Sequence, residues 1–221
     1  MRKINNIFYS LQGEGRNTGR AAVFVRFAGC NLRCPFCDTD FEDYDLMTDE
    51  MILAEIQRVT SSFLPSPFLR PFGSKRPEVE RTLHPSPLVV LTGGEPTLQV
   101  DEAFVDFLHQ HGYEVAMESN GTRPAPQNLD WLTVSPKDGG KWMVDSGRRL
   151  PDEIKIVFDE HTAEKLSSFH FPPSTIHLYL QPCDTGDAAR NIEIVAQCVE
   201  YIKAHPQWRL SLQTHKLIDI E

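Results

Sequence analysis

Three cysteines stand close together near the N-terminus of the chain. Cys30, Cys34 and Cys37 occur in GCNLRCPFCDT with the spacing C-x3-C-x2-C. Three thiolates on one loop can bind three corners of an iron-sulfur cubane, and the absent fourth ligand leaves one iron open to an external chelator. A zinc site would need a fourth protein ligand for its tetrahedral shell. The closest candidates, His84 and Cys183, lie far along the chain, so the ligand count favours a four-iron, four-sulfur cluster.

The residues around the cysteines resemble the motif of the radical S-adenosylmethionine (SAM) superfamily. CNLRCPFCDT has an aromatic residue, Phe36, before the third cysteine, and TGGEP at 92–96 is similar to the glycine-rich strand end of that superfamily. A glycine pair permits the close backbone approach that binding SAM requires. Without the cysteine motif, TGGEP would be an ordinary turn and Phe36 a core aromatic residue.

Four further segments narrow the resemblance. SLQGEG, VRFAGCN, VSPK and QTHK together are similar to the 7-carboxy-7-deazaguanine synthase family, from about residue 7 to the last residue. That family converts 6-carboxy-5,6,7,8-tetrahydropterin to 7-carboxy-7-deazaguanine and ammonia in the queuosine and deazapurine pathway. One alternative is another radical SAM enzyme such as a glycyl-radical activase, against which SLQGEG and QTHK argue. The other is a zinc-stabilised module without catalysis.

The resemblance implies roles for individual residues. The cluster ligands are Cys30, Cys34 and Cys37, and Thr39 coordinates Mg2+. The SAM-binding residues are Phe36, Cys37, Asp38, Gly94, Ser135, Pro136, Lys137, Gln181, Pro182, Cys183 and Asp184. The substrate-binding residues are Leu11, Gln12, Gly13, Glu14, Arg26, Thr92, His215 and Glu221. Cys183 stands where the family more usually has methionine, so it is expected to line the site and not to bind iron.

The chemistry of these residue types agrees with the implied roles. Magnesium favours oxygen ligands and would hold the substrate carboxylate beside Thr39, although the lone threonine would otherwise be taken for a turn former. The guanidinium of Arg26 can offer paired donors to the same carboxylate. Glu14 and the backbone of Gln12 could bind the guanidine-like edge of the pterin. The terminal carboxylate of Glu221 is an acceptor for ring N–H groups, so a tag placed after it is expected to impair turnover.

Strands and helices alternate along the chain. Apolar runs predict strands at 21–29, 88–96, 113–121, 131–137, 153–158, 176–182 and 208–215. Helical spacing predicts helices at 49–59, 101–112 and 192–205, the first behind possible caps at Thr48 and Asp49. This alternation indicates an α/β fold with parallel strands and chemistry at their carboxyl ends. The resemblance makes it a partial (β/α) barrel of the radical SAM type with a mostly parallel sheet.

The segment 61–87 interrupts this pattern with six prolines. Neither a helix nor a strand can continue through so many prolines. We interpret the segment as an insertion or lid within a single radical SAM domain spanning 1–221, while a plain surface excursion remains an equal alternative.

The composition of the chain limits the classes of partner that it is expected to bind. A net charge of -9 over 221 residues, without a run of like charges, argues against direct binding of nucleic acid. The N-terminal residues contain no apolar stretch for a signal peptide or membrane span, which predicts a cytoplasmic protein without a membrane partner. The odd number of cysteines, five, argues against a disulfide framework and favours reduced thiols, with Cys183 and Cys198 packed as small apolar residues. The family also implies a homodimer and an electron donor such as flavodoxin or ferredoxin.

Overall fold

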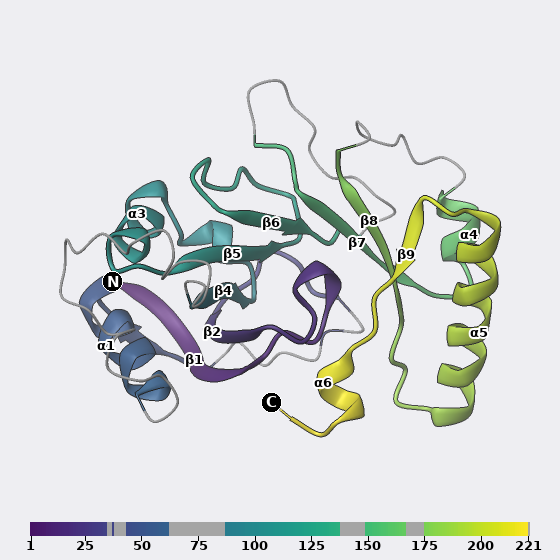
Figure 1. Cartoon of the computed structure of the whole chain (residues 1–221), viewed down its shortest axis with the longest axis horizontal. Coiled ribbons are helices and arrows are strands. Elements are labelled where there is room, and N and C mark those ends of the chain that lie inside the picture. Colours follow the sequence, from purple (N-terminus) through teal and green to yellow (C-terminus); the bar gives the residue numbers. More distant parts are fainter. Residues whose placement is uncertain (35–36, 38–42, 62–86, 138–148, 167–174, 221) are drawn as a thin grey trace, which may run out of the picture.

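The computed structural model describes residues 1–34, 37, 43–61, 87–137, 149–166 and 175–220. In these residues nine strands form one sheet in the order β3-β1-β2-β4-β5-β6-β7-β8-β9 (Figure 1). The strands are β1 Arg2–Leu11, β2 Ala21–Phe27, β3 Asp45–Met47, β4 Leu88–Gly93, β5 Glu114–Ser119, β6 Trp131–Val134, β7 Glu153–Phe158, β8 His177–Pro182 and β9 Trp208–Leu210.

Most neighbouring strands of this sheet are parallel. β1 runs antiparallel to β2 and to β3, whereas each neighbouring pair from β2 to β9 is parallel. The described sheet ends at β3 on one edge and at β9 on the other, so it does not close. The α/β class with a mostly parallel sheet is therefore confirmed, and an open sheet agrees with a partial barrel.

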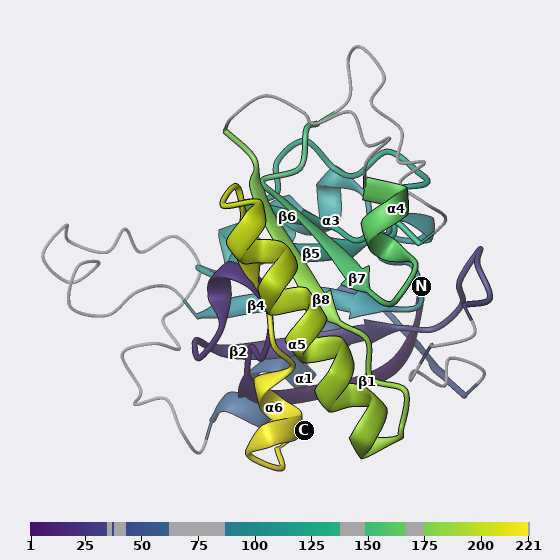
Figure 2. The same cartoon turned by 90° about the vertical axis from the view of Figure 1, so that its right-hand side faces the viewer.

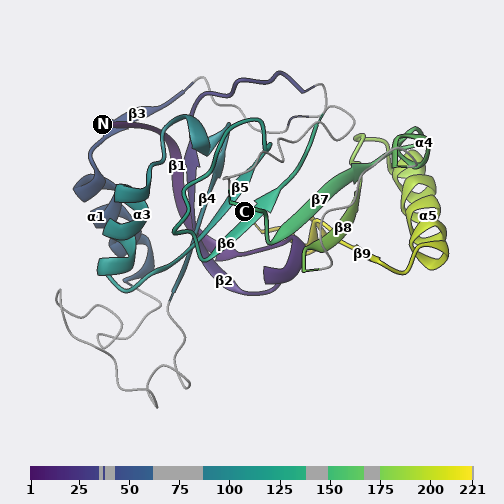
Figure 3. The same cartoon turned by 90° about the horizontal axis from the view of Figure 1, so that it is seen from above.

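Helices pack against the sheet near each of its two edges. α1 (Asp49–Thr60) and α3 (Glu102–Gln110) lie at one end, and α4 (Thr162–Leu166) and α5 (Ala188–Ala204) lie at the other (Figures 1 and 3). The core under α1 and α3 includes Val134, and the core under α4 and α5 includes Ile154. These two residues are paired across β6 and β7, so both cores lie on the same face of the sheet.

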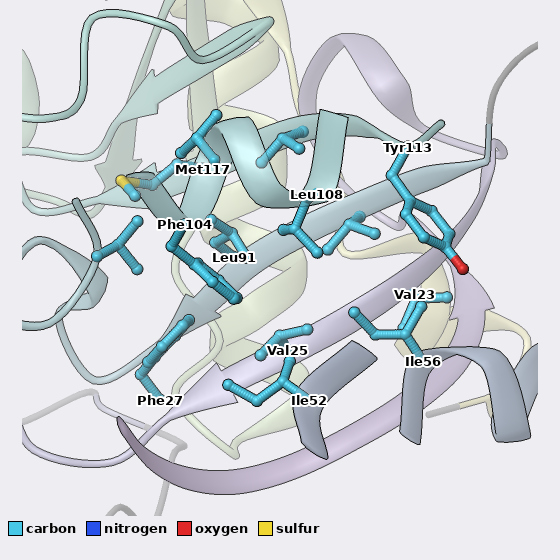
Figure 4. Close-up of a cluster of buried hydrophobic side chains, with 14 of the residues drawn as sticks. Val23, Val25, Phe27, Ile52, Ile56, Leu91, Phe104, Leu108, Tyr113 and Met117 are labelled. Carbon is cyan, nitrogen blue, oxygen red and sulfur yellow. The ribbon is translucent and has the colours of Figure 1, made fainter. Parts of the chain in front are cut away.

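The larger core joins β2 to α1 and α3. Val25 and Phe27 of β2 lie against Ile52 of α1 and Phe104 of α3 (Figure 4). The rings of Phe27 and Phe104 meet edge to face with centroids 6.5 Å apart. All four side chains are fully buried, and each such burial stabilises the fold by about 1.5–3 kcal/mol. This packing holds the carboxyl end of β2, where the cysteine loop begins.

The helices predicted at 49–59 and 101–112 are confirmed. The side chain of Thr48 accepts a hydrogen bond from the backbone N–H of Met51, and that of Asp101 accepts one from Phe104. α3 ends before Gly112, whose φ of 84° suits a residue without a side chain. No helix in the described ranges is long and apolar enough to cross a membrane.

The segment between β1 and β2 covers the amino ends of three parallel strands. Arg20 donates two hydrogen bonds to Glu114, at 2.7 and 2.6 Å, and the guanidinium of Arg16 lies 4.2 Å from the ring centroid of Trp131. The backbone N–H of Arg16 donates to Glu153 over 3.0 Å. Glu114, Trp131 and Glu153 are the first residues of β5, β6 and β7. This segment, residues 12–20, therefore closes the end of the barrel opposite the cysteine loop.

Several features differ from the sequence-based prediction, and two short elements, β3 and α4, were not predicted at all. The strand predicted at 208–215 ends at Leu210, and Thr214–Leu217 forms helix α6 (Figure 2). The helix predicted at 192–205 begins earlier, at Ala188, because the side chain of Asp187 caps it. β1 was not predicted as a strand. Of the segment 61–87, only Ser61 and Pro87 are among the described residues.

Candidate active site

A cavity of about 530 Å³ lies at the carboxyl ends of the parallel strands. β2, β4, β5, β7 and β8 all contribute polar side chains to it: Arg26, Thr92, Glu118 with Ser119, Lys155 and Gln181. The predicted site residues that line the cavity are Leu11, Gln12, Gly13, Glu14, Arg26, Cys30, Cys34, Cys37, Thr92, Gly94, Ser135, Lys137, Gln181, Pro182, Cys183, Asp184 and His215. The structure thus brings distant motifs to one place.

Of the predicted site residues that the structure describes, Pro136 is the one outside the cavity lining. It is buried between Ser135 and Lys137. Phe36, Asp38, Thr39 and Glu221 lie outside the described residues.

The cysteine loop is bound to the glycine turn that follows β4. The backbone N–H of Gly94 donates to the carbonyl of Phe27 over 2.8 Å, and that of Glu95 donates to Gly29 over 2.9 Å. A Cβ atom on Gly94 would lie 2.6 Å from the carbonyl carbon of Gly29 and 3.2 Å from the amide nitrogen of Cys30. Only glycine fits here without moving backbone, so Gly94 sets the distance between the two loops.

The three motif cysteines line the cavity. Cys30 and Cys34 are partly buried and Cys37 is exposed. The amide N–H of Leu32 donates to the sulfur of Cys30 over 3.4 Å, and the side-chain amide of Asn120 lies 4.0 Å from the same sulfur. Hydrogen bonds to sulfur tune the potential of iron-sulfur clusters. Amide donors thus surround Cys30. In the described residues the three cysteines do not converge as ligands of a single metal ion would, so the number and type of the thiols are what fit a cluster held by three cysteines.

A buried carboxylate, Glu95, supports this wall. Its side chain is fully buried and accepts hydrogen bonds from the backbone and hydroxyl of Thr97, from the hydroxyl of Ser119 and from the backbone N–H of Asn120. The Asn120 side chain donates in turn to Asn31 of the cysteine loop over 2.9 Å. Glu95 therefore connects the glycine turn, the end of β5 and the cysteine loop.

The floor of the cavity contains an ion triad. The ammonium of Lys155 donates to Glu14 and, over 2.8 Å, to Glu118. Two glutamine side chains also donate to Glu14, Gln213 over 3.0 Å and Gln181 over 3.2 Å. Residues from both ends of the chain and from its middle thus meet at one carboxylate.

The triad shifts the pKa values of its members. Burial opposes ionisation of Glu14, but the charge and hydrogen bond of Lys155, with the bond from Gln213 and the charge of His215, lower its pKa to about 2. Burial also opposes the charge of Lys155, yet Glu118 and Glu14 raise its pKa. Burial and the charge of Lys155 lower the pKa of Lys137, which donates to Ser135 over 2.8 Å. Glu14 and Lys155 are therefore both charged in the folded protein.

An N-terminal segment and a C-terminal segment of the chain meet at Gly13. Thr214 donates from its backbone and from its hydroxyl to the carbonyl of Gly13, over 3.1 and 3.0 Å. A Cβ atom on Gly13 would lie 2.9 Å from Cγ of His215 and closer still to Nδ1. His215 therefore packs directly over Gly13, and the segments SLQGEG and QTHK form one corner of the cavity.

Arg26 and Thr92 form another wall. They are paired across β2 and β4 and both face the cavity. The guanidinium of Arg26 lies 4.7 Å from the ring centroid of Phe8, which stacks on Phe24 with centroids 5.0 Å apart. The stacked rings hold the arginine in place beside the cavity, where its guanidinium can offer N–H donors to a ligand.

Known proteins resemble the chain over its whole length. No family model matches it. A 7-carboxy-7-deazaguanine synthase from Bacteroides thetaiotaomicron is 44% identical over 220 residues, covering 100% of this chain and 99% of that protein. The synthase from Nitratidesulfovibrio vulgaris is 42% identical and covers 99% of this chain and 98% of its own length. The chain belongs to the 7-carboxy-7-deazaguanine synthase family.

A solved structure of the family agrees with the fold. The crystal structure of QueE from Escherichia coli matches with a TM-score of 0.65 and 25% identity, covering 96% of this chain and 93% of that one. The names of the relatives do not favour the two alternatives, a glycyl-radical activase and a zinc-stabilised module.

Sequence reasoning missed several residues of this family site. Lys155, Glu118, Asn120, Glu95 and Gln213 were not among the predicted site residues. A signal existed in β7, where the charged residues Glu153 and Lys155 alternate with isoleucines, a period that places both charges on one face. The same period places Glu118 opposite the apolar face of β5.

The rim of the cavity is held by Asp184. Lys216 donates to it over 2.9 Å and Asn191 over 2.8 Å. These bonds and one from the backbone N–H of Gly186 lower the pKa of Asp184 to about 2. Burial and the nearby carboxylates raise the pKa of the Cys183 thiol, so Cys183 is a protonated thiol at neutral pH.

The lowered pKa of Glu14 predicts a loss of stability in acid. The carboxyl has an ordinary pKa of 4.5 in the unfolded chain and about 2 in the folded protein. The ionised carboxyl therefore contributes fully to the free energy of unfolding above pH 4.5. This contribution, about 3 kcal/mol in total, is lost as the pH falls toward about 2. Urea unfolding across this range measures the effect. Glu14→Gln should flatten this part of the profile, and an unchanged profile in that variant would contradict the assignment.

Proposed function

We propose that this chain is a radical SAM enzyme that converts 6-carboxy-5,6,7,8-tetrahydropterin to 7-carboxy-7-deazaguanine and ammonia. The proposal rests on one observation: a single cavity is lined by residues of six motifs, namely SLQGEG, the cysteine motif, TGGEP, VSPK, QPCD and QTHK. Its supporting fact is membership of a family whose members carry the name of this activity.

Cys30, Cys34 and Cys37 would hold the four-iron, four-sulfur cluster. Residues of four segments would surround SAM: Phe36, Asp38, Gly94, Ser135, Pro136, Lys137, Gln181, Pro182, Cys183 and Asp184. The bound cluster and SAM supply radical chemistry that no side chain offers. The chain itself contributes orientation, because the glycine turn leaves room at the backbone and the ion triad fixes the floor below it.

The remaining residues would bind the substrate. Arg26 presents donors toward a carboxylate, and Thr39 would share that carboxylate with magnesium. Glu14 is an ionised acceptor on the floor, suited to the N–H donors of an aminopyrimidinone edge. Leu11, Gln12, Gly13, Thr92, His215 and Glu221 would complete the pocket.

The assay is anaerobic incubation of the cluster-reconstituted chain with the carboxytetrahydropterin, SAM, a reductant and magnesium. We expect 7-carboxy-7-deazaguanine and ammonia in equal amounts, in excess of the SAM consumed, because the family regenerates SAM. Omission of SAM is the control. A protein that carries its cluster and binds SAM yet forms no product would contradict the proposal.

Thr39→Ala should weaken the magnesium response. The substitution removes one oxygen ligand from a metal site otherwise built of substrate and water. We expect the iron content and SAM binding to be unchanged, and the magnesium concentration for half-maximal turnover to rise about tenfold. An unchanged magnesium titration would return Thr39 to the role of a turn former.

We also propose a domain organisation, a cellular location and protein partners for the chain. Residues 1–221 would fold as one radical SAM domain, with 61–87 as an insertion or lid. The enzyme would act in the cytoplasm as a homodimer and receive electrons from a flavodoxin or ferredoxin.

A further inference from the structure

Lys155 lies between two carboxylates of the cavity floor. It belongs to β7, is 4% exposed and donates to Glu14 and Glu118. These carboxylates come from the segment after β1 and from β5, so the ammonium group joins three separate parts of the chain. All three residues line the cavity.

The carboxylates keep acceptor positions for a ligand. A carboxylate has about four lone-pair positions. In the described residues, Glu118 accepts from Lys155 and, over 2.9 Å, from Gln12. Its side chain remains 22% exposed and that of Glu14 remains 16% exposed. The floor therefore offers carboxylate oxygens to a ligand in the cavity, whereas the ammonium group of Lys155 already donates to Glu14 and Glu118.

The charge balance of the floor depends on Lys155. Two carboxylates in one low-dielectric site tend to share a proton unless a cation lies between them. In the part of the chain that the structure describes, the other titratable groups facing the triad include Lys137 in the loop after β6, His215 on α6 and Glu153 at the start of β7. Lys155 is the cation with hydrogen bonds to both carboxylates.

We propose that Lys155 is a positioning residue, which holds the carboxyl groups of Glu14 and Glu118 together and directed into the cavity. The floor then accepts the N–H donors of an aminopyrimidinone ring and rejects rings that lack them. The inference deepens the proposed function and rests on it. A site built around a hydrogen-bond donor of its ligand discriminates strongly against the analogue without that donor, because its own buried acceptors are left unpaired.

The first test uses the unaltered, cluster-reconstituted full chain. Calorimetry in buffers of different ionisation enthalpy measures the protons taken up when 7-carboxy-7-deazaguanine, which has the same ring edge, binds at about pH 6. We expect no net uptake, since the ammonium group of Lys155 already balances the charge of the floor. The analogue without the 2-amino group should bind at least about a hundredfold more weakly. Uptake of one proton, or equal affinities, would overturn the proposal.

The second test compares variants. Lys155→Met removes the charge and keeps most of the volume, so the two carboxylates must share a proton. We expect the acid limb of kcat/KM to move up by about one pH unit or more and KM to rise about a hundredfold. Adding Glu118→Gln to Lys155→Met removes one carboxylate and so restores the charge balance of the floor. The acid limb of kcat/KM should then return toward its position in the unaltered chain. Lys203→Met, an exposed lysine of α5, is the matched control and should change neither.

The outcomes separate this inference from the proposed function. An unaltered chain that makes no product refutes the proposed function. An active chain in which Lys155→Met keeps its pH profile and KM refutes only the role of Lys155. If Lys155→Met is too unstable to purify, the proton-uptake measurement on the unaltered chain decides.

Discussion

We expect Cys34→Ala to abolish product formation and to remove most of the iron from the anaerobically reconstituted chain. Cys34 is one of three cysteines that line the cavity from the loop after β2, and a cubane bound at only two corners is labile. The readouts are iron and sulfide per chain, visible absorbance and product formed. Cys30→Ala and Cys37→Ala should behave in the same way.

The matched controls are the other two cysteines. Cys183 lies at the rim of the cavity, and Cys198 is a fully buried residue of α5. Cys183→Ala should keep its iron and most of its turnover. Loss of iron from Cys183→Ala as complete as that from Cys34→Ala would refute the assignment of three cysteine ligands.

Gly94→Ala should disrupt the wall that carries the cysteines. The new Cβ would meet the backbone of Gly29 and Cys30, and backbone cannot turn aside as a flexible side chain can. We expect a loss of about 3 kcal/mol in the free energy of unfolding and at least about a tenfold weaker binding of SAM, because the glycine turn and the cysteine loop are hydrogen-bonded together. Urea unfolding and calorimetric SAM titration measure the two effects.

Gly112→Ala is the control for this variant. Gly112 has a φ of 84° and open space around its Cα, at the end of α3 and outside the residues that line the cavity. The alanine should cost about 1 kcal/mol through backbone strain alone and leave SAM binding unchanged. Equal losses of SAM affinity in the two variants would show that Gly94 has no special role in the site.

The cysteine loop and the parallel sheet could be predicted because their signals are local. Ligand spacing identifies the loop, and runs such as LVVL in β4 indicate buried strands. The floor could not be predicted in the same way. Lys155 and Glu118 are 37 positions apart, and only the order of strands in the sheet brings them together.

The C-terminal strand shows why a local pattern can fail. WRLSLQTH alternates apolar and polar residues, yet β9 is an edge strand with Leu210 38% exposed. Continued pairing would bury little more, whereas Thr214 gains two hydrogen bonds to Gly13. The chain therefore leaves the sheet and turns into α6, which places His215 over the other end of the sequence. Such a long-range contact has no counterpart in the local pattern.

Anomalous diffraction at the iron edge, from crystals of the reconstituted chain with SAM and substrate, tests the central claim most directly. We expect iron density in the cavity beside Cys30, Cys34 and Cys37, with the ring of the pterin against Glu14. Iron bound elsewhere, or a zinc signal at the three cysteines, would contradict it.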